Sequence, residues 1–344
     1  MDMFKDEIWR LARGKFGVIS EKIEQRLTAE TDCIKEYGRG EMLQTMWHLV
    51  EDLKKHDINV TPVLGQGYNV SLVCYLLGIS TFNPMNHPEL ITESYVKSTF
   101  KSSSEMTFKI DKDVTEIIDN YLDSLKCEIE RKDMLGNHSR RVKASRDSDF
   151  IFEFKYVCNS GRIRVIGDLI GWDQFERFHT DDSETMKLIQ EIDIYGTTTS
   201  SFAPITIEAI REISPSNVEE LADALSFTSE KQYGHLQTYL ENRESGNRVF
   251  TGHTEIDDIL RDTYGIILNT WQMGEILKLP IRHASNDAYG KETIRERYRS
   301  LAAFPIVNKC DIFVKAYNLY RLAYAKVHFP NEFKEALHLK IASL

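Results

Sequence analysis

Two aspartates spaced two residues apart, Asp111 and Asp113, are the side chains of this sequence that most clearly suggest chemistry. They lie in the run Thr107–Val114, whose alternation predicts a strand with both carboxylates on one face, beside Thr107 and Lys109. Two like charges this close repel one another, and a hard cation such as Mg²⁺ relieves that repulsion. The pattern therefore predicts a strand that holds metal. A solvated edge strand with surface charges is the alternative interpretation.

A second acid-bearing strand is predicted further along the chain, at Leu188–Gly196. On such a strand Glu191 and Asp193 share one face, while Ile192 and Ile194 lie on the other. The sequence thus predicts two strands that each present acid beside an apolar face.

A glycine loop, Gly65-Gln66-Gly67, lies between a predicted strand at Ile58–Val63 and a predicted apolar helix at Val70–Leu77. A strand, a glycine loop and a helix N-terminus form a layout that can cradle phosphate on backbone N–H groups. A lone G-x-G pattern is equally typical of an ordinary tight turn, so both interpretations stay open.

The elements that must position these residues are mostly helices. Apolar residues at helical spacing predict helices over Ser20–Gly38, Gly40–His56 and Val114–Leu125. After Pro204 the chain is expected to be nearly all helix, and the dense aromatic stripe of Asp311–Leu337 is interpreted as core.

A hairpin is predicted where the runs Phe150–Val157 and Arg162–Ile166 flank Asn159-Ser160-Gly161. A change in composition and element type places a domain boundary near Thr197–Ala203.

Basic residues are concentrated in a segment without strong periodicity, which predicts a mobile loop: Arg131, Lys132, Arg140, Arg141, Lys143 and Arg146. A second basic group, Arg282, Lys291, Arg295 and Arg297, lies in the helical half. Both are candidates for nucleic-acid phosphate contact, and ordinary solvated charges are the alternative in both cases.

Composition limits the class of protein. The chain has 344 residues, 42% hydrophobic and 28% charged, which is enough for two or three globular domains. A formal net charge of -10 argues against a surface coated with basic residues, although a local basic groove is compatible with it. The five cysteines form no C-x-x-C pair, and no signal core or membrane-length apolar run occurs. We therefore expect a cytoplasmic protein with no membrane partner.

Five segments keep a fixed order along the chain: Arg26–Gly38 with the Trp47 helix, Gly65–Ser80, Ile110–Asp113, Ile192–Gly196, and Glu255–Ile267 together with Lys315–Phe333. In that order they resemble the catalytic core of bacterial replicative DNA polymerase III alpha subunits, the family C DNA polymerases. Asp111 and Asp113 match the last two acids of the family's D-I-D-I-D-F-like strand, and Asp193 matches the acid of its later strand.

The resemblance implies an α+β fold. A nucleotidyltransferase-like palm, a small mixed sheet with helices, would occupy residues 1–200, and an all-helical fingers-like domain would occupy residues 201–344. Residues 126–148 would supply only a reduced, thumb-like basic loop. The chain would begin after the family's N-terminal phosphoesterase-like domain and stop before its clamp-binding tail.

The resemblance also implies a reaction. Asp111, Asp113 and Asp193 would hold two Mg²⁺ ions and direct transfer of a dNTP to a DNA primer-template, while Gly65–Gly67 and Ser71 would contact phosphate. Replisome proteins are the further partners that the family implies.

Four departures from the family pattern point toward weak or lost synthesis. Gln66 stands where the family has a basic residue, Tyr68 where it has a small hydroxyl residue, and Glu191 where many relatives have lysine. The family's thumb is represented only by the basic segment. The sequence therefore supports two functions: a minimal, distributive polymerase, or a catalytically degenerate homologue that binds DNA or a replisome protein and modulates replication. A helical interaction protein with only ancestral resemblance is a third interpretation.

Overall fold

The structure is a computed structural model of the 344-residue chain. It describes residues 2–55, 61–62, 67–87, 100–101, 105–111, 115–124, 128–134, 137–143, 151–157, 162–175, 179–192, 202–246, 254–279 and 301–338. The chain divides into two compact units, Met1–Arg177 with Phe329–Leu344, and Phe178–His328. The division falls about twenty residues before the boundary predicted at Thr197–Ala203, and the last helix of the chain belongs to the first unit.

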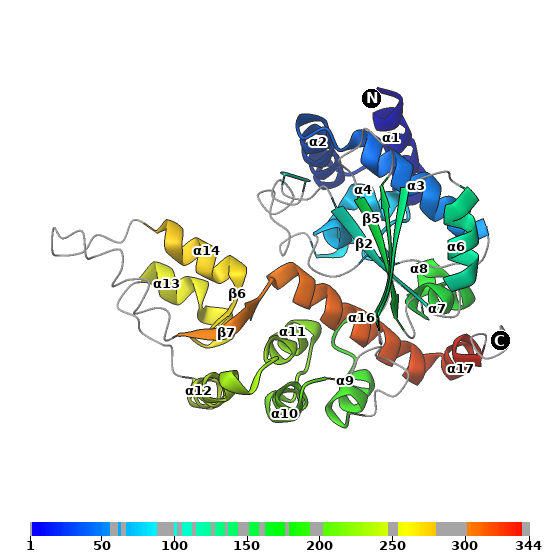
Figure 1. The fold of residues 1–344 in the computed structure, drawn as a ribbon. Helices are drawn as coiled ribbons and strands as arrows, with labels where there is room; N and C mark the ends of the chain where they lie inside the picture. Colours follow the sequence, from blue (N-terminus) through cyan, green and yellow to red (C-terminus); the bar gives the residue numbers. More distant parts are fainter. Residues whose placement is uncertain are drawn as a thin grey trace. The chain divides into compact units, whose positions relative to one another are not determined.

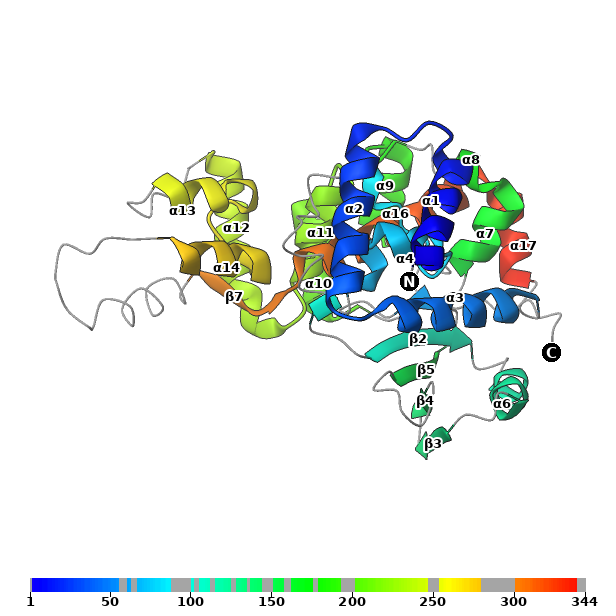
Figure 2. The ribbon, with the colours of Figure 1, turned by 90° about the horizontal axis from the view of Figure 1, so that it is seen from above.

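Four helices begin the first unit: α1 (Asp2–Phe16), α2 (Glu21–Glu36), α3 (Gly40–Lys55) and the short α4 (Leu72–Leu76) (Figures 1 and 2). The Ser20 hydroxyl caps α2 by accepting a hydrogen bond from the backbone N–H of Ile23 at 3.4 Å. Each of α2 and α3 buries one apolar stripe, with Leu27 and Met46 fully enclosed. The two helices predicted over residues 20–56 are confirmed.

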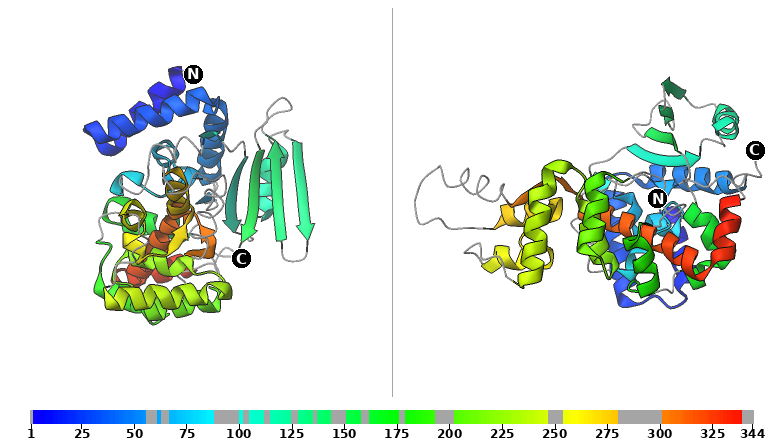
Figure 3. Two further views of the ribbon diagram at one scale, coloured as in Figure 1. Left: turned by 90° about the vertical axis from the view of Figure 1, so that its left-hand side faces the viewer. Right: turned by 90° about the horizontal axis from the view of Figure 1, so that it is seen from below.

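A five-stranded sheet, whose longer strands lie next to one another as arrows in the left view of Figure 3, completes the first unit with its flanking helices. Its strands are β1 (Thr61–Pro62), β2 (Glu105–Asp111), β3 (Glu128–Met134), β4 (Asn137–Lys143) and β5 (Ile151–Val157), in the order β1-β2-β5-β4-β3. β2 and β5 are parallel, and the other neighbouring pairs are antiparallel. The helices are α6 (Thr115–Ser124), α7 (Arg162–Ile170), α8 (Trp172–Phe175) and α17 (Pro330–His338), of which α17 packs against α7.

The register of β2 against β5 follows their alternating apolar residues. Met106 is opposite Phe152 and Phe108 is opposite Phe154, so apolar positions of the two strands coincide on one face of the sheet. A slip of one residue would place polar and charged positions there instead. β2 has β1 on one side and β5 on the other, so the alternative of an edge strand is wrong.

The second unit is built of helices around a long central one. It contains α9 (Ser183–Gln190), α10 (Pro204–Ile213), α11 (Val218–Ser226), α12 (Tyr233–Ser245), α13 (Thr254–Ile259), α14 (Thr270–Lys278) and α16 (Lys309–His328). α16 packs against α9 and α11 and buries the aromatic stripe as predicted, including Phe313, Tyr317 and Tyr320.

A two-stranded parallel sheet in this unit was not predicted. β6 (Ile267–Asn269) pairs with β7 (Ala302–Val307), and a small core of Ile256, Leu260, Ile267, Ile276 and Ala302 lies against them. The buried Gln232 side chain joins β7 to the end of α11, because its amide nitrogen donates to the carbonyl oxygens of Ala303 and Ser226 at 2.8 and 3.1 Å.

Two predictions of local structure are wrong. Arg162–Ile166 is not the second strand of a hairpin but the first part of α7, in which Ile166 is buried at helical spacing from Ile170. The basic segment is not a mobile loop, because Glu128–Met134 and Asn137–Lys143 pair as the antiparallel hairpin β3–β4. Its charged residues conceal the period of two that marks a strand. The α+β class is confirmed, and the palm and fingers remain predictions.

Candidate functional site

Asp111 is the last residue of β2, where the strand pairs with Val157 of β5. The predicted strand is therefore confirmed from Thr107 to Asp111, and positions 107, 109 and 111 share one of its faces. A carboxylate at the carboxyl end of a strand in a parallel pair stands where α/β sheets commonly present ligand-binding residues.

The two other predicted metal ligands, Asp113 and Asp193, lie outside the described residues, as do Gly65 and Gln66. Among the residues whose placement is described, no group of three His, Cys, Asp or Glu side chains is close enough to hold a metal ion. Carboxylate oxygens are the ligands that Mg²⁺ prefers, so the predicted donor set suits that ion.

The strand predicted at Leu188–Gly196 is wrong in its first part. Leu188–Gln190 is the last turn of α9, and Glu191 follows in a turn in which Ile192 adopts a positive φ of 58°. Glu191 therefore does not share a strand face with Asp193. Its carboxylate lies 3.9 Å from the Lys187 ammonium, which is an exposed helical i,i+4 pair.

α9 is firmly anchored just before Asp193. The Asp182 carboxylate caps the helix by accepting from the Thr185 N–H at 2.9 Å, and it also lies 3.0 Å from His328 Nε2. The Tyr320 hydroxyl donates to the His179 carbonyl at 2.6 Å and accepts from the Asp182 N–H at 2.8 Å. Burial alone would raise the pKa of Asp182, but the hydrogen bonds from Thr185 and His328 hold that pKa below its usual range.

The helix that follows the glycine loop is capped by Ser71. Gly67 has a positive φ of 66°, and the one-turn helix η1 (Tyr68–Val70) leads from it into α4. The buried Ser71 hydroxyl accepts from the Cys74 N–H at 3.1 Å and donates to Glu30 at 2.7 Å. These contacts are those of a helix cap.

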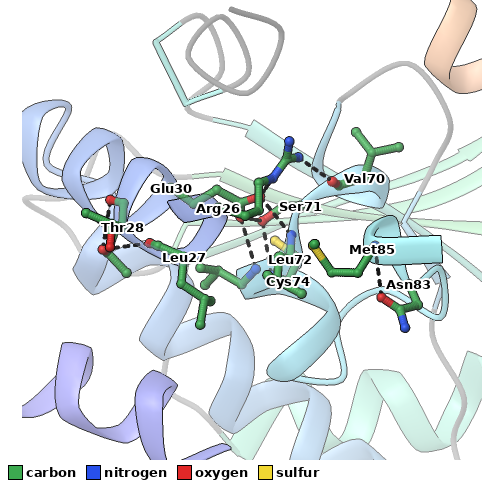
Figure 4. A network of polar contacts seen from close by, with 12 residues as sticks. Arg26, Leu27, Thr28, Glu30, Val70, Ser71, Leu72, Cys74, Asn83 and Met85 are labelled. Carbon is green, nitrogen blue, oxygen red and sulfur yellow. Dashed lines mark hydrogen bonds and ion pairs between the residues drawn. The ribbon is translucent and has the colours of Figure 1, made fainter. Parts of the chain in front are cut away.

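Glu30 of α2 occupies the N-terminus of α4 (Figure 4). Its fully buried carboxylate accepts from the N–H groups of Leu72 and Val73 at 2.9 and 3.0 Å and from Arg26 Nε at 2.6 Å. Arg26 also donates to the Val70 carbonyl at 3.1 Å. An internal anion therefore already takes the place that a phosphate would take at this helix N-terminus. Sequence reasoning missed Glu30, and its only signal was an acid on the apolar stripe of a predicted helix.

The basic candidates fall in different places. Arg131 is in β3, where it is exposed and ion-paired with Asp123 of α6. Lys132 is in β3, and Arg140, Arg141 and Lys143 are in β4. Arg146, Arg282, Lys291, Arg295 and Arg297 lie outside the described residues.

Strand register brings together lysines that sequence reasoning did not connect. Lys155 of β5 is directly beside Lys109 of β2, two residues before Asp111. Ser139 and Lys132 continue the same row across β4 and β3. Three of the four positions in this row carry lysine. In the sequence, Lys109 and Lys155 lie on two separate predicted strands, and nothing there indicates that the strands are neighbours.

Two family models match the chain in order. The model for the bacterial DNA polymerase III alpha NTPase domain matches residues 2–124, and the model for the finger domain of the same subunit matches residues 163–285. The chain is a relative of bacterial DNA polymerase III alpha subunits. No curated protein matches it.

The two matches to the polymerase III alpha subunit cover part of the elements described above, and β3, β4, β5, β7, α16 and α17 lie outside them. The NTPase-domain match spans α1 to α6 and includes Glu30, Ser71 and Asp111, while the finger-domain match begins in α7 and reaches past α14. The chain is therefore related to DNA polymerases through both parts. A bilayer crossing needs a long apolar helix, and none of the helices over the residues described above meets that need.

Proposed function

We propose that this chain is a divergent, minimal family C polymerase that transfers dNTPs to a DNA primer, with Asp111, Asp113 and Asp193 as ligands of two Mg²⁺ ions. The observation that carries the proposal is the position of Asp111 at the carboxyl end of β2, within the stretch that matches the NTPase domain. β2 is the strand on which the family resemblance places its paired acids.

The chemistry requires little covalent work from the protein. In-line displacement at the α-phosphorus joins the primer 3′ oxygen to phosphorus and releases pyrophosphate, while the proton of the 3′ hydroxyl passes to water. Bound divalent ions supply charge stabilisation to the attacking and leaving oxygens. Asp111, Asp113 and Asp193 would orient those ions, and the capped α4 would fix the exit of the glycine loop.

The row of lysines that includes Lys109 and Lys155 would compensate for the absence of a basic residue at position 66, which is glutamine. Lys109 and Lys155 occupy neighbouring positions on the face that carries Asp111. Lysine binds phosphate as a point charge, so these two residues would hold the triphosphate in place of the missing basic residue of the loop. The glycine loop would then contribute backbone N–H groups at Gly65–Gly67.

Primer extension tests the proposal. The wild-type chain, Asp111→Asn and Glu116→Gln are incubated with a primed template, dNTPs and either Mg²⁺ or Mn²⁺. Glu116 is an exposed acid in the first turn of the following helix, α6, and serves as the matched control. We expect distributive extension by the wild-type and Glu116→Gln chains and none by Asp111→Asn. Equal extension by wild type and Asp111→Asn would contradict the metal assignment.

Gln66 favours a second candidate function, a catalytically degenerate homologue that binds DNA or a replisome protein. In that case no chain extends the primer with either metal ion. The wild-type, Asp111→Asn and Glu116→Gln chains then bind primed DNA, or inhibit extension by a separate replicative polymerase, to the same extent.

A further inference from the structure

A groove on the first unit is lined by no residue of β2. It has a volume of about 370 Å³ and is lined by residues of α1 and of the C-terminal part of α4: Arg10, Leu11, Gly14, Lys15, Tyr75 and Leu76. α1 and α4 pack side by side (Figure 2). The proposed polymerase chemistry uses none of these residues.

Helical geometry explains the hollow. Around α1, Gly14 and Leu11 fall between Arg10 and Lys15, since successive residues turn by about 100°. A Cβ placed on Gly14 would meet no atom within 4 Å, so the space above it is open. The missing side chain thus leaves an apolar floor with a cation on each side.

The charge of the groove differs from that of the chain. None of its lining residues is acidic, whereas the whole chain carries a formal charge of -10. Arg10 is paired with Glu7 at 2.7 Å, and the Lys15 ammonium lies 5.4 Å from the centre of the Tyr75 ring. The Lys15 head group therefore supplies the strongest attraction for an anion.

The apolar floor of the groove, formed by Leu11, Tyr75 and Leu76, favours an acidic peptide over single-stranded nucleic acid. Single-stranded nucleic acid binds by stacking bases on open aromatic faces. Here Tyr75 is only 8% exposed and Lys15 covers its ring, so no aromatic face is open for stacking. The half-buried Leu11 and Leu76 instead suit an aliphatic side chain.

We propose that this α1–α4 groove is a docking site for a short acidic segment of a partner protein. An aliphatic side chain of that segment lies over Gly14, between Leu11 and Leu76, and its carboxylates lie against Lys15 and Arg10. The charge complementarity of the groove and its apolar floor carry this assignment, which is independent of polymerase activity.

Fluorescence anisotropy with a labelled short peptide of Asp, Glu and Leu residues tests the proposal. Gly14→Leu fills the hollow without changing any charge, and it exchanges glycine for a better helix former, so the fold is retained. Lys15→Gln removes the cation, and Lys22→Gln, on an exposed position of α2, is the matched control. A labelled oligothymidine is titrated in parallel.

We expect Gly14→Leu and Lys15→Gln each to weaken peptide binding by about tenfold or more, and Lys22→Gln to leave it unchanged. Primer extension by Gly14→Leu should equal that of wild type. Absence of peptide binding by the wild-type chain, or equal affinity in Gly14→Leu, would overturn the proposal. Loss of oligothymidine binding rather than peptide binding in these variants would assign the groove to nucleic acid instead.

Discussion

At the scale of single residues, the fully buried Glu30 carboxylate joins α2 to the N-terminus of α4. It satisfies the backbone N–H groups of Leu72 and Val73 and pairs with Arg26, which is itself only 13% exposed. A carboxylate enclosed in this way stabilises the fold only while all its partners are present. Because α4 follows the glycine loop, Glu30 couples the helix pair α2–α4 to the loop that is proposed to contact nucleotide.

Glu30→Ala should therefore lower the free energy of unfolding by about 3–5 kcal/mol, because it removes the carboxylate that pairs with Arg26 and accepts from two helix N–H groups. Glu30→Gln should cost less, because one acceptor oxygen remains. Urea unfolding followed by circular dichroism measures both, with the exposed Glu24→Ala of the same helix as control, expected within about 0.5 kcal/mol of wild type. A loss below about 1 kcal/mol in Glu30→Ala would show that the network is dispensable.

We expect Asp223 to make the stability of the second unit depend on pH. Burial raises the pKa of this carboxyl to about 7, although the Tyr239 hydroxyl donates to it at 3.0 Å and Lys309 attracts its charge. Glu220 and Asp262 add repulsion. In the unfolded chain the pKa of this carboxyl is near 3.8. Between that pH and about pH 7, the folded chain holds the proton and the unfolded chain has lost it, so the free energy of unfolding falls as pH rises.

Asp223→Asn mimics the protonated form and should remove this loss. The difference in unfolding free energy between variant and wild type should grow in favour of the variant by about 1–3 kcal/mol between about pH 4 and pH 7, then stay constant. Urea unfolding across that range measures it. A difference that does not change with pH would mean that Asp223 is ionised in the folded chain.

At the scale of elements, the β3–β4 hairpin is the part of the first unit that presents most of the predicted DNA contacts. Its register places one arginine of β4 opposite another arginine, and the next one opposite glutamates. Arg140 is opposite Arg131, whereas Arg141 lies between Glu130 and Glu153 on its two neighbouring strands. Opposite charges at neighbouring positions neutralise one another, and like charges leave a positive field.

Arg140→Gln should consequently weaken binding to primed DNA and reduce the slope of log affinity against log salt by about 1. Arg141→Gln should leave the slope unchanged, because Glu130 and Glu153 already offset that charge. Anisotropy titrations at several salt concentrations make the comparison. An unchanged slope for Arg140→Gln would remove the hairpin from the DNA interface.

The sequence predicted an element correctly where its apolar residues followed a single spacing, either that of a strand or that of a helix. β2 was predicted because Met106, Phe108 and Ile110 alternate strictly with polar residues, and α2 because an N-cap serine precedes a clear apolar stripe. The apolar residues of Leu188–Ile192 fit the spacing of a helix as well as the alternation of a strand. The signal that decides for a helix lies earlier in the chain, where Asp182 caps α9 by accepting from the Thr185 N–H.

Contacts between distant segments were beyond sequence reasoning. The pairing of Lys109 with Lys155 depends on the parallel register of β2 and β5, and the Glu30 cap depends on α2 meeting α4. Neither leaves a periodic signal in one segment. Of the candidate site, the sequence predicted the strand and Asp111, while the residues that support them came from the structure.

At the scale of the whole molecule, a chain with a formal charge of -10 matches two successive domains of the polymerase III alpha subunit. The central claim is that Asp111 and Asp113, from one stretch of this chain, and Asp193, from a later one, act as one metal site. Groups that act as a unit do not have additive effects when they are removed.

The rate of single-nucleotide incorporation under enzyme excess tests that claim most directly, measured for wild type, Asp111→Asn, Asp193→Asn and the double variant with Mg²⁺. We expect each single variant to lose at least about a hundredfold in rate and the double variant to be no slower than the slower single one. An Asp193→Asn chain that incorporates nucleotide at the wild-type rate would contradict the three-carboxylate site.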